Sequence, residues 1–389
     1  MNDFNFFLPT KLYFGKDKDE HTLSHILKEE GIKRIALVIG QGSVRKNGLL
    51  DKVLFTLKEN DIDYLLLEGV RPNPTKEMGD LFISKIKEYK PEYIIAIGGG
   101  SVIDTAKYMA VGYYDEGEAF DFNMHLRTPS KALPIGVILT ISASGSEMSN
   151  SCVIQDDKRN LKKGFNSEII RPRFAIENPI YTYEVNKFQT ACGITDILMH
   201  TLERYFQASS SDYLLSDNFA LGLLKTVKEA GLKAISNPYD FEARANLMLA
   251  SSYSHNGLTH MGKKFLMPVH QLEHALSGCY PNIAHGEGLA ILFPAWCEYF
   301  FFEHLDKLDR LGREVFNLQY EDKKENAEAC ILALKDYFKA LGLSVNLAKD
   351  IDTKKLSEVF SNNGQYVVND NNRIIDKEVA QKIYDMCKE

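Results

Sequence analysis

Histidines and one aspartate in the second half of the chain have the spacing of metal ligands. Asp196 and His200 are four residues apart, as are His270 and His274, and His285 follows the second pair after a short break. A spacing of four places both members of a pair on one face of a helix. A carboxylate combined with imidazoles suits Fe²⁺ or Zn²⁺ better than Ca²⁺ or Mg²⁺. The pattern indicates a divalent metal site, and the spacing leaves open which histidines are ligands.

A second set of residues has the pattern of a phosphate-binding turn. Residues 98–101, Gly-Gly-Gly-Ser, separate an apolar run from a helical pattern that begins at Val102. Glycines let a pyrophosphate approach the backbone, and the start of a helix offers unpaired N–H groups and a positive dipole. Residues 40–43 form another glycine-rich turn after an earlier apolar run. Either turn alone could be an ordinary tight connection, but two in corresponding places favour a bound dinucleotide.

The elements that carry these turns alternate between strands and helices. Apolar and branched runs predict strands at residues 10–15, 33–39, 62–67, 92–97 and 133–140, with helices starting near residue 46 or 48, at 76 and at 102. This alternation predicts a parallel, doubly wound sheet whose ligands bind at the strand carboxyl ends. Residues 141–147, rich in serine, are interpreted as an ordinary loop, and residues 151–179 as a β-rich excursion.

Helical patterns replace strand patterns in the second half of the chain. Apolar residues recur at helical spacing in residues 195–207, 212–234, 241–256, 269–279, 286–303, 327–341 and 376–387. We therefore predict an α/β domain over residues 1–186 and an all-α domain over residues 187–389. The candidate metal ligands fall in the helical domain and the candidate phosphate-binding turns in the other. Enzymes built from two such halves commonly work in the cleft between them.

Composition narrows the class of protein further. A length of 389 residues exceeds one usual core and agrees with two domains. The net charge of −7 argues against nucleic acid as a partner. The six cysteines lack CxxC spacing and are typical of reduced thiols in a cytoplasmic protein. We expect no membrane span and no signal peptide, because long apolar runs and a basic N-terminus are missing.

Taken together, the motifs resemble the iron-containing, or group III, alcohol dehydrogenase family over nearly the whole chain. Residues 98–107 look like its nucleotide-binding signature, residues 190–200 like its first metal motif, and residues 270–278 with 285–288 like its second. The chain is most similar to the NADPH-dependent butanol dehydrogenase and aldehyde reductase branch. The resemblance implies a Rossmann-like α/β domain, an all-α C-terminal domain, one Fe²⁺ or Zn²⁺ ion, a small aldehyde or alcohol substrate, and a homodimer.

The resemblance also implies roles for individual residues. The metal ligands would be Asp196, His200, His270 and His285, and His274 would be a catalytic residue near the nicotinamide. The residues placed against the cofactor are Gly42, Ser43, Gly99, Gly100, Ser101, Asp104, Thr140, Ser146, Lys162, Thr182 and Val185. His274 and His285 are one residue further apart than this motif leads us to expect, so we predict a bulge in the loop that joins them.

The turn after the second predicted strand bears on the choice of cofactor. An acidic residue there would bind the adenosine ribose and repel a 2′-phosphate. NAD-preferring relatives carry Asp at the position that aligns with Gln41, whereas Gln41, Gly42 and Ser43 are uncharged and Arg45 and Lys46 are close by. We therefore predict a preference for NADP(H) over NAD(H).

Other functions are open at this point. The main alternative is a polyol dehydrogenase resembling glycerol dehydrogenase, with NAD and zinc, which Gln41 and the spacing of His270 and His274 disfavour. A lyase resembling dehydroquinate synthase would need a polar pocket, whereas residues 265–267 and 198–199 are apolar. A nucleotide-binding module without metal is disfavoured because all four ligands are present. Hydrolase and NTPase functions lack support, since the chain has no GxSxG elbow and no Walker lysine.

Overall fold

The computed structural model describes residues 2–207, 213–264, 266–362, 366–368 and 373–388. The chain forms two compact units: Phe7–Glu184 is an α/β unit, and Val185–Glu389 together with Met1–Phe6 is a helical unit. The predicted fold class, a parallel-sheet α/β region followed by a helical region, is confirmed. Among the described residues, none of the helices combines the length and hydropathy that a membrane crossing requires.

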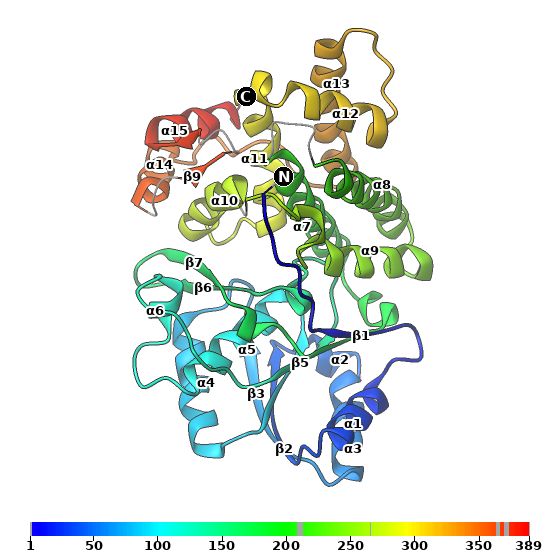
Figure 1. The fold of residues 1–389 in the computed structure, drawn as a ribbon, viewed down its shortest axis with the longest axis vertical. Helices are drawn as coiled ribbons and strands as arrows, with labels where there is room; N and C mark the ends of the chain where they lie inside the picture. Colours follow the sequence, from blue (N-terminus) through cyan, green and yellow to red (C-terminus); the bar gives the residue numbers. More distant parts are fainter. Residues whose placement is uncertain (1, 208–212, 265, 363–365, 369–372, 389) are drawn as a thin grey trace. The chain divides into compact units, whose positions relative to one another are not determined.

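Six parallel strands form the main sheet of the α/β unit (Figure 1). They are β1 (Lys11–Phe14), β2 (Arg34–Gly40), β3 (Asp63–Val70), β4 (Tyr93–Gly98), β5 (Ile135–Leu139) and β8 (Phe174–Glu177), in the spatial order β1-β8-β5-β4-β2-β3. Every residue of β4 is buried, which explains why this strand is a continuous apolar run in the sequence. The five strands predicted from apolar runs are confirmed.

The order in which successive strands are added to the sheet reverses between β2 and β4. β2 and β4 lie side by side, yet the chain continues from β2 to β3 on one side and from β4 to β5 on the other. In doubly wound sheets this arrangement opens a crevice at the strand carboxyl ends, where ligands bind. Both glycine-rich turns singled out in the sequence follow these two strands.

Helices cover the sheet and a small hairpin is added to it. The helices are α1 (Glu20–Glu29), α2 (Ser43–Lys46), α3 (Leu49–Glu59), α4 (Lys76–Tyr89), α5 (Gly100–Gly112) and α6 (Phe120–Asn123). The antiparallel strands β6 (Ser151–Asp156) and β7 (Leu161–Asn166) account for part of the predicted β-rich excursion. The hairpin strand β6 packs against α5.

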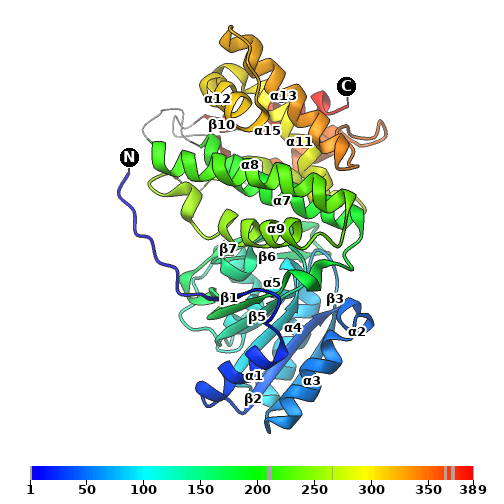
Figure 2. The ribbon, with the colours of Figure 1, turned by 90° about the vertical axis from the view of Figure 1, so that its right-hand side faces the viewer.

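Nine α-helices make up the described part of the helical unit (Figure 2). They are α7 (Lys187–Phe206), α8 (Leu214–Ser236), α9 (Phe241–Ser254), α10 (Pro268–Cys279), α11 (His285–Tyr299), α12 (Leu305–Phe316), α13 (Lys323–Ala340), α14 (Thr353–Asn362) and α15 (Lys377–Met386). A short antiparallel pair, β9 (Tyr366–Val367) and β10 (Ile374–Ile375), departs from the all-α prediction. Residue 212, the predicted start of one helix, lies outside the described residues.

Helix α7 begins two turns before its predicted start at Thr195. Asn186 caps it, because the side-chain oxygen accepts a hydrogen bond from the Gln189 N–H (2.8 Å). The helix packs against α8, α9 and α11, and most of its residues are buried. α7 is therefore a central element of the helical unit, and it carries Asp196 and His200.

Candidate functional site

Four neighbouring strands end beside residues predicted to bind the cofactor. Residues 42 and 43 follow β2, residues 99–101 follow β4, Thr140 follows β5, and Thr182 closes the short turn after β8. Because these strands are parallel neighbours, the four segments lie along one edge of the sheet. The Thr140 N–H donates to the Gly98 carbonyl (3.1 Å), which joins two of them directly. The structure thus brings these predicted residues together at the carboxyl ends of the strands, around the point where the strand order reverses.

Close packing explains the glycines of the turn after β4. A Cβ atom on Gly99 would lie 2.2 Å from Cγ2 of Ile141, and one on Gly100 would lie 2.3 Å from Oγ of Ser144. A side chain at either position would therefore push the loop after β5 away from the turn. Gly100 starts α5, whose N-terminal N–H groups and dipole favour an anion. The serine-rich loop, interpreted from sequence as an ordinary connection, packs directly on the predicted phosphate-binding turn.

A buried lysine ties this loop to α5. Lys107 is fully buried, and its Nζ donates to the carbonyl (2.7 Å) and hydroxyl (2.9 Å) of Ser146, the carbonyl (3.0 Å) and hydroxyl (3.2 Å) of Ser149, and the carbonyl of Ser151 (2.8 Å). Burial lowers the pKa of Lys107 to about 8, against the opposing effect of Asp104. The sequence interpretation included Lys107 only as part of the signature. Its place in an apolar stretch, Ala106-Lys107-Tyr108, is the signal that could have marked it as buried.

Asp104 and Ser146, both predicted to contact the cofactor, bind each other. The Ser146 hydroxyl donates to Oδ1 of Asp104 (2.6 Å), and the Val153 N–H donates to Oδ2 (2.9 Å). Burial raises the pKa of Asp104, while Lys107 acts in the opposite direction. These bonds join α5, the serine-rich loop and β6, so both residues have a structural role whatever they contact in the loaded protein.

Two further predicted cofactor residues come from other elements. Lys162 is buried in β7, where it pairs with Gln155 of β6. Val185 is the first residue of the helical unit after the α/β unit, and its carbonyl accepts a hydrogen bond from the Thr190 hydroxyl (3.4 Å). Their contact with a cofactor stays a prediction.

Asp196 lies at the centre of the predicted metal ligands. Its Oδ1 is 3.5 Å from Nδ1 of His200, 3.5 Å from Nε2 of His270 and 3.7 Å from Nε2 of His285. Asp196, His270 and His285 offer donor atoms that all lie within 4.8 Å of one another. The His200 ring stacks on that of His270, with centroids 4.7 Å apart. The structure therefore brings all four predicted ligands together.

A glycine after His285 lets α11 reach α7. A Cβ atom on Gly286 would lie 2.2 Å from the carbonyl oxygen of Cys192, which belongs to α7 and precedes Asp196 by about one turn. Only direct contact between the two backbones places His285, the first residue of α11, beside Asp196. The loop before His285, for which we predict a bulge, contains a tight turn in which the Ile283 N–H donates to the Tyr280 carbonyl (3.0 Å).

Two buried glutamates that the sequence interpretation missed orient two of these histidines. A carboxylate oxygen of Glu203 is hydrogen-bonded to Nδ1 of His270, and one of Glu273 to Nδ1 of His285. Both carboxylates are fully buried. Each bond leaves Nε2 facing Asp196, and such carboxylates fix the tautomer and ring orientation of metal-binding histidines. Glu203 could have been found from sequence, because it lies seven residues after Asp196 and so on the same face of α7.

The donor atoms fit a divalent cation. Oδ1 of Asp196, Nδ1 of His200 and Nε2 of His270 are buried and have no hydrogen-bond partner among the described residues. An unsatisfied buried polar atom costs about 1–3 kcal/mol, so one cation would relieve three such costs together. Burial holds the pKa of His200 well below its usual value. For His270, burial is outweighed by Glu203 and Asp196, which raise its pKa to about 9, and a metal ion would replace that proton.

His274 lies one turn after His270 on α10. It groups with Glu273 and His285, with donor atoms within 4.8 Å of one another, and not with the set around Asp196. Its ring centroid is 5.7 Å from that of His285 and 6.5 Å from that of His270. His274 is thus a neighbour of the candidate metal site, and its catalytic role stays a prediction.

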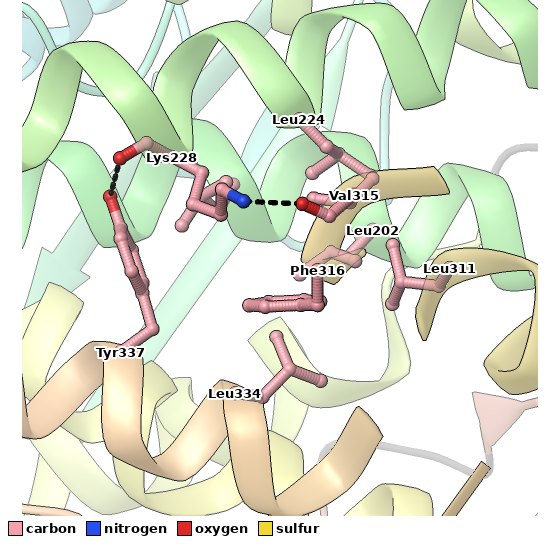
Figure 3. Close-up of a pocket in the computed structure, with 9 residues that line it drawn as sticks. Leu202, Leu224, Lys228, Leu311, Val315, Phe316, Leu334 and Tyr337 are labelled. Atoms are coloured by element: carbon pink, nitrogen blue, oxygen red, sulfur yellow. Dashed lines mark hydrogen bonds between the residues drawn. The ribbon is translucent and has the colours of Figure 1, made fainter. Parts of the chain in front are cut away.

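An apolar cavity in the helical unit is a separate feature (Figure 3). Its volume of about 10 Å³ is room for one water molecule at most. The residues that line it are Leu198, Leu202, Leu224, Lys228, Leu311, Val315, Phe316, Leu334 and Tyr337. Leu198 and Leu202 each lie two residues from a ligand, hence on the far side of α7 from Asp196 and His200. Leu198 therefore does not line a substrate pocket at the predicted metal ligands, and Phe265, the other apolar candidate, lies outside the described residues.

Known proteins resemble the chain along its whole length. The model of the iron-containing alcohol dehydrogenase family matches residues 9–179, and that of the Fe-containing alcohol dehydrogenase C-terminal family matches residues 190–386. The NADH-dependent butanol dehydrogenase A of Clostridium acetobutylicum is 39% identical over 89% of both chains. The NADPH-dependent aldehyde reductase of Escherichia coli is 34% identical over 90% of this chain and 89% of that protein.

A solved structure agrees with these sequence matches. The crystal structure of NADH-dependent butanol dehydrogenase A from Thermotoga maritima superposes with a TM-score of 0.95 and 32% identity, covering 100% of this chain and 99% of that one. Family and fold therefore agree. The chain belongs to the iron-containing alcohol dehydrogenase family, in its butanol dehydrogenase and aldehyde reductase branch, and is an oxidoreductase of alcohols and aldehydes.

Proposed function

We propose that the protein is a metal-dependent enzyme that interconverts a primary alcohol and its aldehyde, of the size of butanol and butanal, with NADP(H). The observation that carries the proposal is the cluster of one carboxylate and three imidazoles around Asp196. The names of the similar proteins, butanol dehydrogenase and aldehyde reductase, support this substrate class. The family implies a nicotinamide cofactor and a metal ion.

Different residues of the chain have different roles in this reaction. Asp196, His200, His270 and His285 would hold Fe²⁺ or Zn²⁺, both of which accept such mixed donors. When bound, the metal ion polarises a carbonyl group as a Lewis acid, and the nicotinamide supplies the hydride. We assign His274 to the movement of a proton to or from the alcohol oxygen, directly or through water, because imidazole exchanges protons near neutral pH.

The proposal predicts a specific pair of substrates. Protein loaded with Fe²⁺ or Zn²⁺ should oxidise NADPH in the presence of butanal, and removal of the ion with a chelator should abolish the reaction. The decrease in NADPH absorbance measures the rate. Glycerol with NAD is the comparison, since it is the reaction of the alternative polyol dehydrogenase. Faster turnover of glycerol than of butanol or butanal would favour that alternative.

The preference for NADP(H) rests on the edge formed by β2 and β3. Residues 42 and 43 start α2 without a carboxylate, and Arg45 belongs to the same short helix. One acidic residue lies beside this helix. Glu68 of β3 accepts hydrogen bonds from Nε (3.0 Å) and Nη2 (2.8 Å) of Arg45. Both side chains are about half exposed, so the pair contributes little to stability, but Glu68 competes with a 2′-phosphate for Arg45.

We expect a lower KM for NADPH than for NADH, and a larger difference in the Glu68→Gln variant. Removing this carboxylate frees Arg45 for the phosphate, an effect of up to about fivefold for an exposed pair. Steady-state KM values for both cofactors at fixed butanal provide the measurement. The Glu59→Gln variant, which changes a glutamate at the end of α3, is the matched control. A clear preference of the unchanged protein for NADH would contradict the assignment.

A further inference from the structure

The three histidines around Asp196 are not held in the same way. His270 and His285 each have a buried carboxylate on Nδ1. His200 has no such bond in the described part of the chain, and it turns Nδ1 toward Asp196 at 3.5 Å. A ligand whose ring is free to rotate loses affinity for its ion, because the orientation must be fixed on binding. Something other than a carboxylate must therefore hold the ring of His200.

The ring of His200 contacts two other imidazoles. One is that of His270, with centroids 4.7 Å apart and planes 24° apart. The other neighbour is His255, with centroids 4.2 Å apart and planes 47° apart. Aromatic rings at these separations attract each other and restrict rotation. His270 is itself a predicted metal ligand, whereas His255 is not.

A buried arginine fixes where His255 stands. His255 is the C-cap residue of α9 and follows Ser254, the last residue of the helix. Nη1 of Arg204 donates to the carbonyl of His200 (2.5 Å) and to the carbonyl of Ser254 (2.8 Å). The fully buried guanidinium group thus links the backbone that carries one ring to the backbone that carries the other. The contact between His200 and His255 is therefore set by the frame of α7 and α9, not by a surface loop.

We propose that His255 is a positioning residue of the metal site, which holds the ring of His200 by aromatic contact in the way that Glu203 and Glu273 hold the other two histidines by hydrogen bonds. The inference rests on the proposed function in one respect, namely that the Asp196 cluster binds a metal ion. It concerns the face of the His255 ring and not its nitrogen atoms. An aromatic ring without nitrogen should therefore replace it, and an aliphatic side chain of similar size should not.

Two variants separate these requirements. His255→Phe keeps an aromatic face, and His255→Leu fills the space without one. The unchanged protein and both variants are loaded with Co²⁺ or Zn²⁺, and loss of the ion to an excess of chelator is followed over time. The absorption spectrum of the Co²⁺ form reports the ligand arrangement independently of catalysis. Circular dichroism and thermal unfolding of the metal-free proteins show whether each variant is folded.

We expect His255→Leu to release the ion about tenfold faster, the lower end of the range for residues that orient metal ligands, with an altered Co²⁺ spectrum. The rate of ion release from His255→Phe should stay within about threefold of that from the unchanged protein, because phenylalanine keeps an aromatic contact with His200. Equal release by all three proteins, or equal loss in both variants, would overturn the proposal. Failure of the unchanged protein to bind either ion would instead reject the proposed function.

Discussion

Replacing His270 by alanine should remove the metal ion and slow NADPH-dependent reduction of butanal on the order of a thousandfold, since polarisation by a metal supplies several kcal/mol. Nε2 of His270 lies 3.5 Å from the central Asp196 oxygen, and its loss also leaves the buried Glu203 carboxylate without its ring partner. Elemental analysis of the purified variant and its kcat provide the two measurements. Unchanged metal content together with unchanged kcat would show that the ion binds elsewhere.

A graded set of variants makes this result specific. Glu203→Gln keeps the size of the side chain but weakens its bond to Nδ1 of His270, so metal affinity should fall by about 10–100-fold, less than for His270→Ala. His25→Ala removes an exposed histidine of α1 that pairs with Glu29, and it should change neither metal content nor rate. A Glu203→Gln variant as active and as metal-rich as the unchanged protein would argue against the orienting role of Glu203.

Replacing Lys107 by methionine should lower the free energy of unfolding by about 3 kcal/mol, because a buried group with several charge-assisted bonds is lost. The serine-rich loop would also lose the bonds that hold it against the glycine turn after β4. We therefore expect KM for NADPH to rise about tenfold, which corresponds to about 1.4 kcal/mol. Urea unfolding and steady-state kinetics measure the two effects. Lys87→Met, which changes an exposed lysine bonded to the Asp115 carbonyl, is the matched control and should alter neither.

The pH dependence of stability separates a charge effect from a packing effect at Lys107. Burial lowers the pKa of Lys107 from 10.5 to about 8. Between these values the unfolded chain keeps a proton that the folded protein has released, so this group makes stability rise with pH, by about 3 kcal/mol in all. The Lys107→Met variant lacks this contribution. The difference in unfolding free energy between the two proteins should therefore widen from about pH 8 to pH 10.5, and a constant difference would indicate packing alone.

Elements with strong local patterns could be predicted from the sequence. β4 is buried on both faces and is therefore a continuous apolar run, and the glycines after it mark the turn. Helix α12 carries the same kind of signal, because its buried residues Leu308, Leu311 and Val315 recur at helical spacing, yet it is absent from the helices predicted above. Helix α7 begins before its predicted start at Thr195, and the signal that marks its first turn is the cap at Asn186.

The roles of residues in the candidate metal site could not be predicted from sequence patterns alone. Spacing places His270 and His274 on one face of α10 but does not separate them. That separation depends on which of them faces Asp196 on another helix. The same holds for Glu203 and Glu273, whose partners are 67 and 12 residues away in sequence. Contacts between helices decide these roles, and periodicity describes only one helix at a time.

The contact between Gly286 and the carbonyl of Cys192 has a consequence for how metal ions exchange. The predicted ligands stand on α7, α10 and α11, and α11 packs against both of the other helices. A zinc finger unfolds when it loses its metal, whereas this frame should persist when emptied. We therefore expect that a bound ion can be exchanged in the folded protein. The ion found in a given preparation would then record what the cell and the buffers supplied, and comparisons of activity should begin from protein that has been stripped and reloaded.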